Sequence, residues 1–153
     1  MTKRAHFLLM LLALLAWSAN ADSLPDHCAI LPTSEGPKLI RQCSRGSPTA
    51  VSDFWLPSRS QVIAIEQRLP EFLRKSGHHI KVSDSYRQYI GITSHGKKRI
   101  YVNSFGKFVL DYSKERNWHV TSVTVCDGGD VFWGVEFDPA DDTFHDLQFN
   151  GEA

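Results

Sequence analysis

One change of hydrophobic period, near residue 79, constrains the fold of this 153-residue chain more than any other feature. Ahead of it, residues 58–76 place apolar side chains at spacings of three and four, which predicts an amphipathic helix. Ser58 and Gln61 form a capping-box pattern at its start, while Pro70 inside it predicts a kink or a break. Beyond residue 79, apolar and polar residues alternate, which is typical of half-buried strands.

The alternating region predicts an antiparallel meander. Residues 86–93 and 99–105 flank a short turn that contains glycine, which is a hairpin signal. Further strands are expected over residues 119–126, 131–137 and 143–149. A helix followed by such a meander buries itself across one face of the sheet. The predicted fold class is therefore α+β, with one main N-terminal helix packed on an antiparallel sheet of about four to five strands.

The N-terminal part of the chain predicts two further segments. Residues 1–21 have the basic flank, apolar run and small terminal residues of a signal peptide. The apolar run is too short to span a bilayer as a helix, so no membrane span is expected after cleavage. Residues 22–57 hold five of the seven prolines, which predicts an irregular, disulfide-tied covering segment. Residues 58–153 form the helix-plus-sheet domain, and 22–153 are expected to fold as one globular unit.

The charge balance and the cysteines indicate which partners and which cellular compartment to expect. The chain has 17 basic and 17 acidic residues and no long basic run, which argues against nucleic acid as a partner. Export would place the domain in the periplasm or outside the cell, where thiols are oxidised. Cys28, Cys43 and Cys126 then predict one disulfide and one spare thiol, and their spacing leaves all three pairings open.

Catalytic signals are weak. Cys126 could act as a nucleophile with His119 or His145 as its base, but a bridged cysteine ahead of a glycine-rich turn is the simpler interpretation. The histidines lack metal-ligand spacing, so neither a metal nor a cofactor is expected. We therefore expect no catalytic residues, and the chain leans away from being an enzyme.

A carboxylate pair is the other catalytic arrangement that the sequence offers. Glu136 could approach Asp127 or Asp130 at the separation that glycoside hydrolysis needs. Many acids in any small domain could do the same, so the pattern is not specific.

The candidate binding residues follow from composition and from strand alternation. Tyrosine and arginine are enriched at binding hot spots. If Ile90 and Ile92 face the helix, Arg87 and Tyr89 stand on the open face of the sheet, and in the opposite register this argument weakens. The alternative is that the aromatic side chains fill the core, or a second small core under residues 22–57. The candidate binding residues are Tyr86, Arg87, Tyr89, Asp127 and Asp130.

Five strings carry a resemblance: Tyr86-Arg87-Gln88-Tyr89, Tyr101-Val102-Asn103, Cys126-Asp127-Gly128-Gly129, Phe132-Trp133-Gly134-Val135 and Asn150-Gly151. Over roughly residues 38–153 the chain resembles a loose group of uncharacterised exported proteins of Gram-negative bacteria. The resemblance implies a periplasmic or secreted location, and it implies a disulfide between Cys43 and Cys126, with Cys28 outside the shared region. The helix-then-meander order is also similar to cystatin-like inhibitor folds, which is a likeness of architecture alone.

Together these features favour a non-enzymatic periplasmic protein-binding module, of an inhibitor or immunity type, whose partner is an envelope protein. A small envelope hydrolase that uses Cys126 or a carboxylate pair is one alternative. A structural envelope component is the other. The sequence does not fix the oligomeric state.

Overall fold

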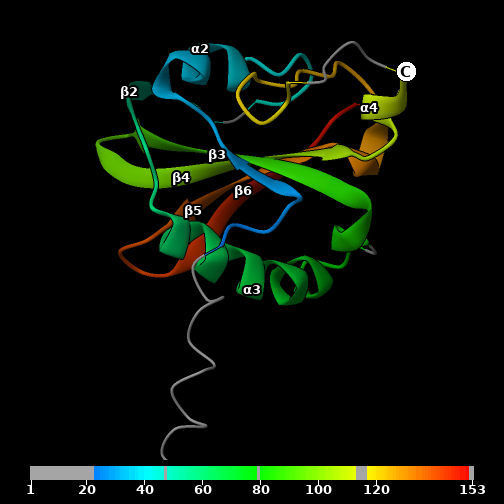
Figure 1. Cartoon of the computed structure of the whole chain (residues 1–153). Coiled ribbons are helices and arrows are strands. Elements are labelled where there is room, and N and C mark those ends of the chain that lie inside the picture. The colour runs from blue at the N-terminus through cyan, green and yellow to red at the C-terminus, as the bar shows by residue number, and fades with distance from the viewer. Residues whose placement is uncertain (1–22, 47, 79, 113–116, 152–153) are drawn as a thin grey trace, which may run out of the picture.

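A computed structural model describes residues 23–46, 48–78, 80–112 and 117–151, so the predicted signal peptide, residues 1–21, lies outside the described residues. A central sheet separates two layers (Figure 1). Helix α3 (Arg59–Lys75) covers one face. The four-residue helix α2 (Gly36–Leu39) and irregular segments cover the other face. No helix within the described ranges has the length and apolarity that crossing a membrane requires.

The sheet is mixed. Its strands are β1 (Cys28–Ile30), β2 (Val51–Trp55), β3 (Ser85–Ser94), β4 (Lys97–Gly106), β5 (Trp133–Asp138) and β6 (Thr143–Phe149). The order is β1-β3-β4-β5-β6, and β2 also pairs with β3. Strand β1 runs parallel to β3, while the other pairs are antiparallel. The short elements are α4 (Val109–Tyr112), η1 (Thr33–Glu35), η2 (Val82–Asp84) and η3 (Gly129–Val131).

The α+β class is confirmed, and the purely antiparallel meander is imprecise. Residues 22–57, expected to be irregular, supply β1 and β2, which pair with β3 along residues 87–89 and 91–94. Residues 119–126, expected to be a strand, form turns and irregular backbone instead. The amide of Gln88 satisfies part of that backbone: it donates to Trp118 O and Thr121 O, both at 2.7 Å, and accepts from Val123 N at 2.9 Å.

Helix α3 begins at the expected cap. The Ser58 side chain accepts from the Gln61 backbone, and the Gln61 side chain accepts from the Ser58 backbone, which completes the capping box. Of the kink or break predicted at Pro70, the break is wrong, because α3 continues through this residue as one helix. Leu69 and Leu73, on either side of Pro70, are buried against the sheet, and these contacts override the weak helix propensity of proline.

The two faces of the sheet hold separate apolar clusters. The face under α3 packs Val62 and Ile65 of the helix against Val102 and Val135 of the sheet. On the opposite face, Ile90 and Ile92 of β3 pack with Leu31, Leu39 and Tyr101. These isoleucines therefore face away from α3, which is the opposite of the register that would have exposed Arg87 and Tyr89.

Candidate functional site

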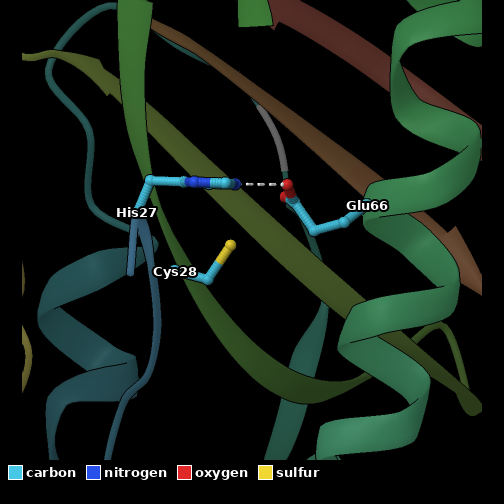
Figure 2. A group of neighbouring side chains, drawn as sticks. All are labelled: His27, Cys28 and Glu66. Atoms are coloured by element: carbon cyan, nitrogen blue, oxygen red, sulfur yellow. Dashed lines mark hydrogen bonds and ion pairs between the residues drawn. The ribbon is translucent and has the colours of Figure 1, made fainter. Parts of the chain in front are cut away.

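A buried ion pair joins helix α3 to the sheet. Glu66 of α3 accepts two hydrogen bonds from Arg87 of β3, from Nε at 2.6 Å and from Nη2 at 2.8 Å. The Tyr89 hydroxyl donates to the same carboxylate, and His27 Nε2 lies 3.0 Å from Glu66 Oε2 (Figure 2). The Arg87 side chain is 1% exposed and that of Glu66 is 10% exposed. A carboxylate offers about four lone-pair positions, so this one is filled by its protein partners.

Local geometry brings these side chains to one side of the sheet. Arg87 and Tyr89 are two residues apart on β3, so they share a face. Glu66 follows Val62 by four residues and precedes Leu69 by three, which places it beside the buried stripe of α3. That spacing is the signal that could have identified Glu66 from the sequence, where it was not among the candidate residues.

The charge state of the group follows from its partners. Burial alone would raise the pKa of Glu66, but the hydrogen bonds and the positive charge of Arg87 outweigh burial, and the pKa lies below its ordinary value. Burial, reinforced by the charge of Glu66, holds the pKa of Tyr89 well above its ordinary value. At neutral pH the arrangement is an ionised carboxylate among donors. It is therefore not suited to general-acid catalysis by Glu66.

Cys28 lies beside this group. Its thiol is directed toward the space between His27 and Glu66, and the residue is 3% exposed (Figure 2). Burial raises the pKa of the Cys28 thiol to about 12, and the negative charge of Glu66 adds to the effect. Since the thiolate is the reactive form, Cys28 is a poor nucleophile in this state.

The expected disulfide is present. Cys43 and Cys126 are bonded, with their Cα atoms 4.7 Å apart, and Cys28 is the free cysteine. The pairing that the resemblance implies is thus confirmed. Cys126 is consequently not available as a nucleophile while the bond is intact.

The structure separates the predicted binding residues. Arg87 and Tyr89 come together at Glu66, but their expected exposure is wrong: they are 1% and 0% exposed, because β3 turns them toward α3. Tyr86 points to the other face, where its ring lies 4.6 Å from that of Trp118. None of these three side chains stands on an open sheet face.

Asp127 and Asp130 are exposed and lie near the end of the sheet. Asp127 forms an isolated backbone bridge with Gly151. Asp130 belongs to η3 and borders a pocket. Glu136, the third acid of the expected carboxylate pairs, is buried in β5 and accepts from Arg99 Nη1 at 2.8 Å. Its carboxylate is therefore part of an ion pair, and the hydrolase arrangement gains no support.

The pocket that Asp130 borders, which we call the α3-end pocket, has a volume of about 420 Å³. It lies between the segment that follows α3 and the segment that leads into β5. Its lining includes His78, Lys81, Asp84, Asp130, Val131 and Trp133. The lining thus combines charges of both signs with apolar surface. The buried Nε1 of Trp133 has no hydrogen-bond partner among the described residues.

An apolar rim, formed by Phe108 and Val131, adjoins the pocket. Phe108 is 48% exposed and Val131 is 42% exposed. Both side chains lie over Gly106, where an added Cβ would come within 2.5 Å of Phe108 and 2.7 Å of Val131. Glycine at this position therefore allows the two side chains to pack directly on the backbone of β4. The rim adds exposed apolar surface next to the apolar lining of the pocket.

No protein-family model, curated protein or solved structure matches this chain significantly.

Proposed function

We propose that this protein is a non-enzymatic binding module of the cell envelope, and that it binds a segment of a partner protein at the α3-end pocket and its apolar rim. The observation that carries the proposal is the pocket itself, bordered by the exposed Val131 and Asp130. A concave site with an apolar lining and a few charged groups is the usual form of a binding site.

The chemistry of the lining favours a protein segment as the ligand. His78 and Lys81 offer cationic or donor groups, and Asp84 and Asp130 offer anionic acceptors. An apolar side chain flanked by charged groups of both signs would complement this lining. Protein surfaces commonly present an apolar side chain in such surroundings. Anchor side chains in well-packed pockets carry most of the energy of protein–protein binding.

The groups that could have carried catalysis are engaged elsewhere, which also favours binding. Cys126 is bridged to Cys43, Glu66 is ion-paired with Arg87, and Glu136 is ion-paired with Arg99. The disulfide agrees with an exported protein, since such bonds persist in oxidising compartments. A periplasmic or secreted location, and an inhibitor or immunity type of action, are part of the proposal on this basis.

The test compares two exposed apolar positions. The tagged protein is used to capture partners from native envelope extract, the enriched protein is purified, and its binding is measured by calorimetry. Val131→Asp places a charge at the mouth of the pocket and should weaken binding at least about tenfold, which corresponds to about 1.4 kcal/mol. Leu56→Asp is the matched control, because Leu56 is 61% exposed and does not line the pocket.

Two results would overturn the proposal. The first is the absence of any protein that binds the purified chain directly. The second is a partner whose affinity is unchanged by Val131→Asp or is lowered equally by Leu56→Asp, since binding would then not involve the pocket.

A further inference from the structure

Outside the α3-end pocket, the structure brings together a histidine, a cysteine and a glutamate whose order in the sequence suggests no site. His27 Nε2, Cys28 Sγ and a carboxylate oxygen of Glu66 all lie within 4.8 Å of one another. We propose that these three side chains bind one Zn²⁺ ion, and that Arg87 and Tyr89 hold the Glu66 carboxylate in position for it (Figure 2).

The donor set fits zinc by its chemistry. Zn²⁺ takes imidazole nitrogen, thiolate sulfur and carboxylate oxygen, with bonds of about 2.0–2.3 Å. Three ligands of these types leave a fourth tetrahedral position open for water or an anion. With such bonds the ligand atoms would stand closer together than the 4.8 Å limit within which they now lie, so the site contracts on binding. The exposed side of His27 allows that movement, because its side chain is 40% exposed.

The backbone explains how adjacent residues reach one ion. Neighbours within a strand point to opposite faces, but His27 lies in the turn before β1, where Cys28 N donates to Pro25 O at 2.8 Å. The turn brings the imidazole to the same side as the thiol of Cys28, the first residue of β1. Arg87 N donates to His27 O at 2.9 Å, which fixes this turn to β3.

The existing ion pair supports the site and also limits its affinity. Arg87 Nε and the Tyr89 hydroxyl both bond Glu66 Oε1, which leaves Oε2 as the oxygen that faces His27. Metal-ligating carboxylates are commonly held by hydrogen bonds from neighbouring groups in this way. Arg87 Nη2 also contacts Oε2, at 2.8 Å, so its charge opposes the cation and we expect moderate binding.

Binding exchanges protons for the metal. Zn²⁺ takes the place of the hydrogen bond between His27 Nε2 and Glu66 Oε2. The ionised carboxylate can only accept, so Nε2 gives up its proton through water, and the neutral imidazole that binds the metal carries its proton on Nδ1. The Zn–S bond forms as the Cys28 thiol loses its proton to the buffer. The ion with one thiolate, one carboxylate and the guanidinium then carries one net positive charge. That charge favours an anion at the fourth position.

Cobalt gives the decisive measurement, since Co²⁺ occupies zinc sites and its bonds to thiolate absorb in the near ultraviolet. The purified protein, with Cys43 and Cys126 oxidised, has Cys28 as its single thiol, so such a band reports Cys28 alone. One equivalent of Co²⁺ should produce the band, Zn²⁺ should abolish it, and Cys28→Ser should lack it.

Competition with a chromophoric chelator then measures the affinity for Zn²⁺. His27→Gln should weaken it at least about tenfold. His145→Gln should leave it unchanged, although His145 belongs to a second group, with Asp138 and Asp141, whose ligand atoms also lie within 4.8 Å of one another. His27 is part-exposed, so its variant tests the site even if Cys28→Ser folds poorly. The proposal is overturned if no cobalt–thiolate band forms, if Cys28→Ser retains the band, or if the two histidine variants bind Zn²⁺ alike.

Discussion

Two arginines of the described residues, Arg87 and Arg45, are buried on opposite faces of the sheet, and their charges are held by different kinds of group. Under α3, Arg87 donates to the carboxylate of Glu66, and both partners are almost fully buried. On the opposite face, Arg45 is 9% exposed and donates to neutral groups: Asn150 Oδ1 at 2.6 Å, Asn103 Oδ1 at 2.8 Å and the Tyr101 hydroxyl at 3.1 Å. One arginine is thus held by an opposite charge, and the other by dipoles.

The difference reflects the two layers that these arginines attach. Helix α3 satisfies most of its own backbone, so apolar contacts and one buried ion pair, with a second ion pair at the surface, hold it against the sheet. The opposite layer is largely irregular, and its backbone groups need partners. Side-chain amides supply them: Asn103 Nδ2 donates to Val123 O at 3.1 Å, and Asn150 Nδ2 donates to Val125 O at 2.6 Å. The disulfide between Cys43 and Cys126 adds a covalent tie to the same layer.

The largest expected effect is on the α3 face. Arg87→Met should lower the free energy of unfolding by about 3–5 kcal/mol, because it leaves the Glu66 carboxylate buried without its counter-charge. Urea denaturation near neutral pH measures the change. Arg68→Met is the control, since Arg68 pairs with Asp142 at the surface and should cost little. Equal losses in the two variants would show that the buried pair has no special role.

Removal of the disulfide should have the next largest effect. The double variant Cys43→Ser with Cys126→Ser should lose about 2–4 kcal/mol, as its unfolded chain is no longer constrained across 83 residues. Hydrogen exchange should accelerate around residues 117–126 before it does so in α3. The unmodified protein, in which the bond is intact, is the reference. Exchange that accelerates equally in α3 would contradict the separation into two independently attached layers.

Arg45→Met should lower the free energy of unfolding by less than Arg87→Met does. This comparison tests most directly whether the two arginines are held in different ways. The substitution leaves the oxygens of Asn103 and Asn150 short of a donor, which costs about 1–3 kcal/mol for buried neutral groups. The exposed Arg41→Met serves as its control. A loss of stability as large as that of Arg87→Met would mean that the presence of a counter-charge is not what distinguishes the two arginines.

The sequence predicted the elements whose signals are local. The capping box of Ser58 and Gln61 is present, and the hairpin between β3 and β4 turns at His95 and Gly96, which have φ of 49° and 76°. The strands β1 and β2 were not predicted, because they are short and lie among prolines. Their stability comes from pairing with β3, which the local sequence does not show. Residues 119–126 alternate like a strand, but tertiary hydrogen bonds hold them as irregular backbone.

The candidate site was harder to predict from the sequence than the fold. The reason is that the sequence does not fix which face of the sheet each side chain of β3 occupies. A shift of one residue reverses every side chain of a strand, so alternation alone could not decide which face Arg87 and Tyr89 occupy. The pairing of Glu66 with His27 joins positions 39 residues apart, and no spacing rule connects them. Asp130 belongs to a turn that the sequence indicates by its two glycines, and it is the predicted binding residue that borders the α3-end pocket.

The smallest expected effect is the dependence of the α3 face on pH. The pKa of Glu66 is lower in the folded state than its ordinary value of about 4.5, so the folded state resists protonation there. This stabilisation is present above that value and is lost as the pH falls through the folded-state pKa. Glu66→Gln resembles the protonated acid, and its stability should approach that of the unmodified protein as the solution becomes acidic. Urea denaturation from about pH 7 to about pH 3 measures the gap.

Glu71→Gln is the matched control for this titration, because Glu71 lies on the exposed side of the same helix and water screens its pair with Lys75. The gap between Glu71→Gln and the unmodified protein should therefore stay small at every pH. If the gap for Glu66→Gln is also independent of pH, the carboxylate does not titrate with folding, and the ion pair with Arg87 then acts by packing and hydrogen bonding alone. The two arginines would in that case be held by the same means, and the contrast between the faces would rest on the disulfide.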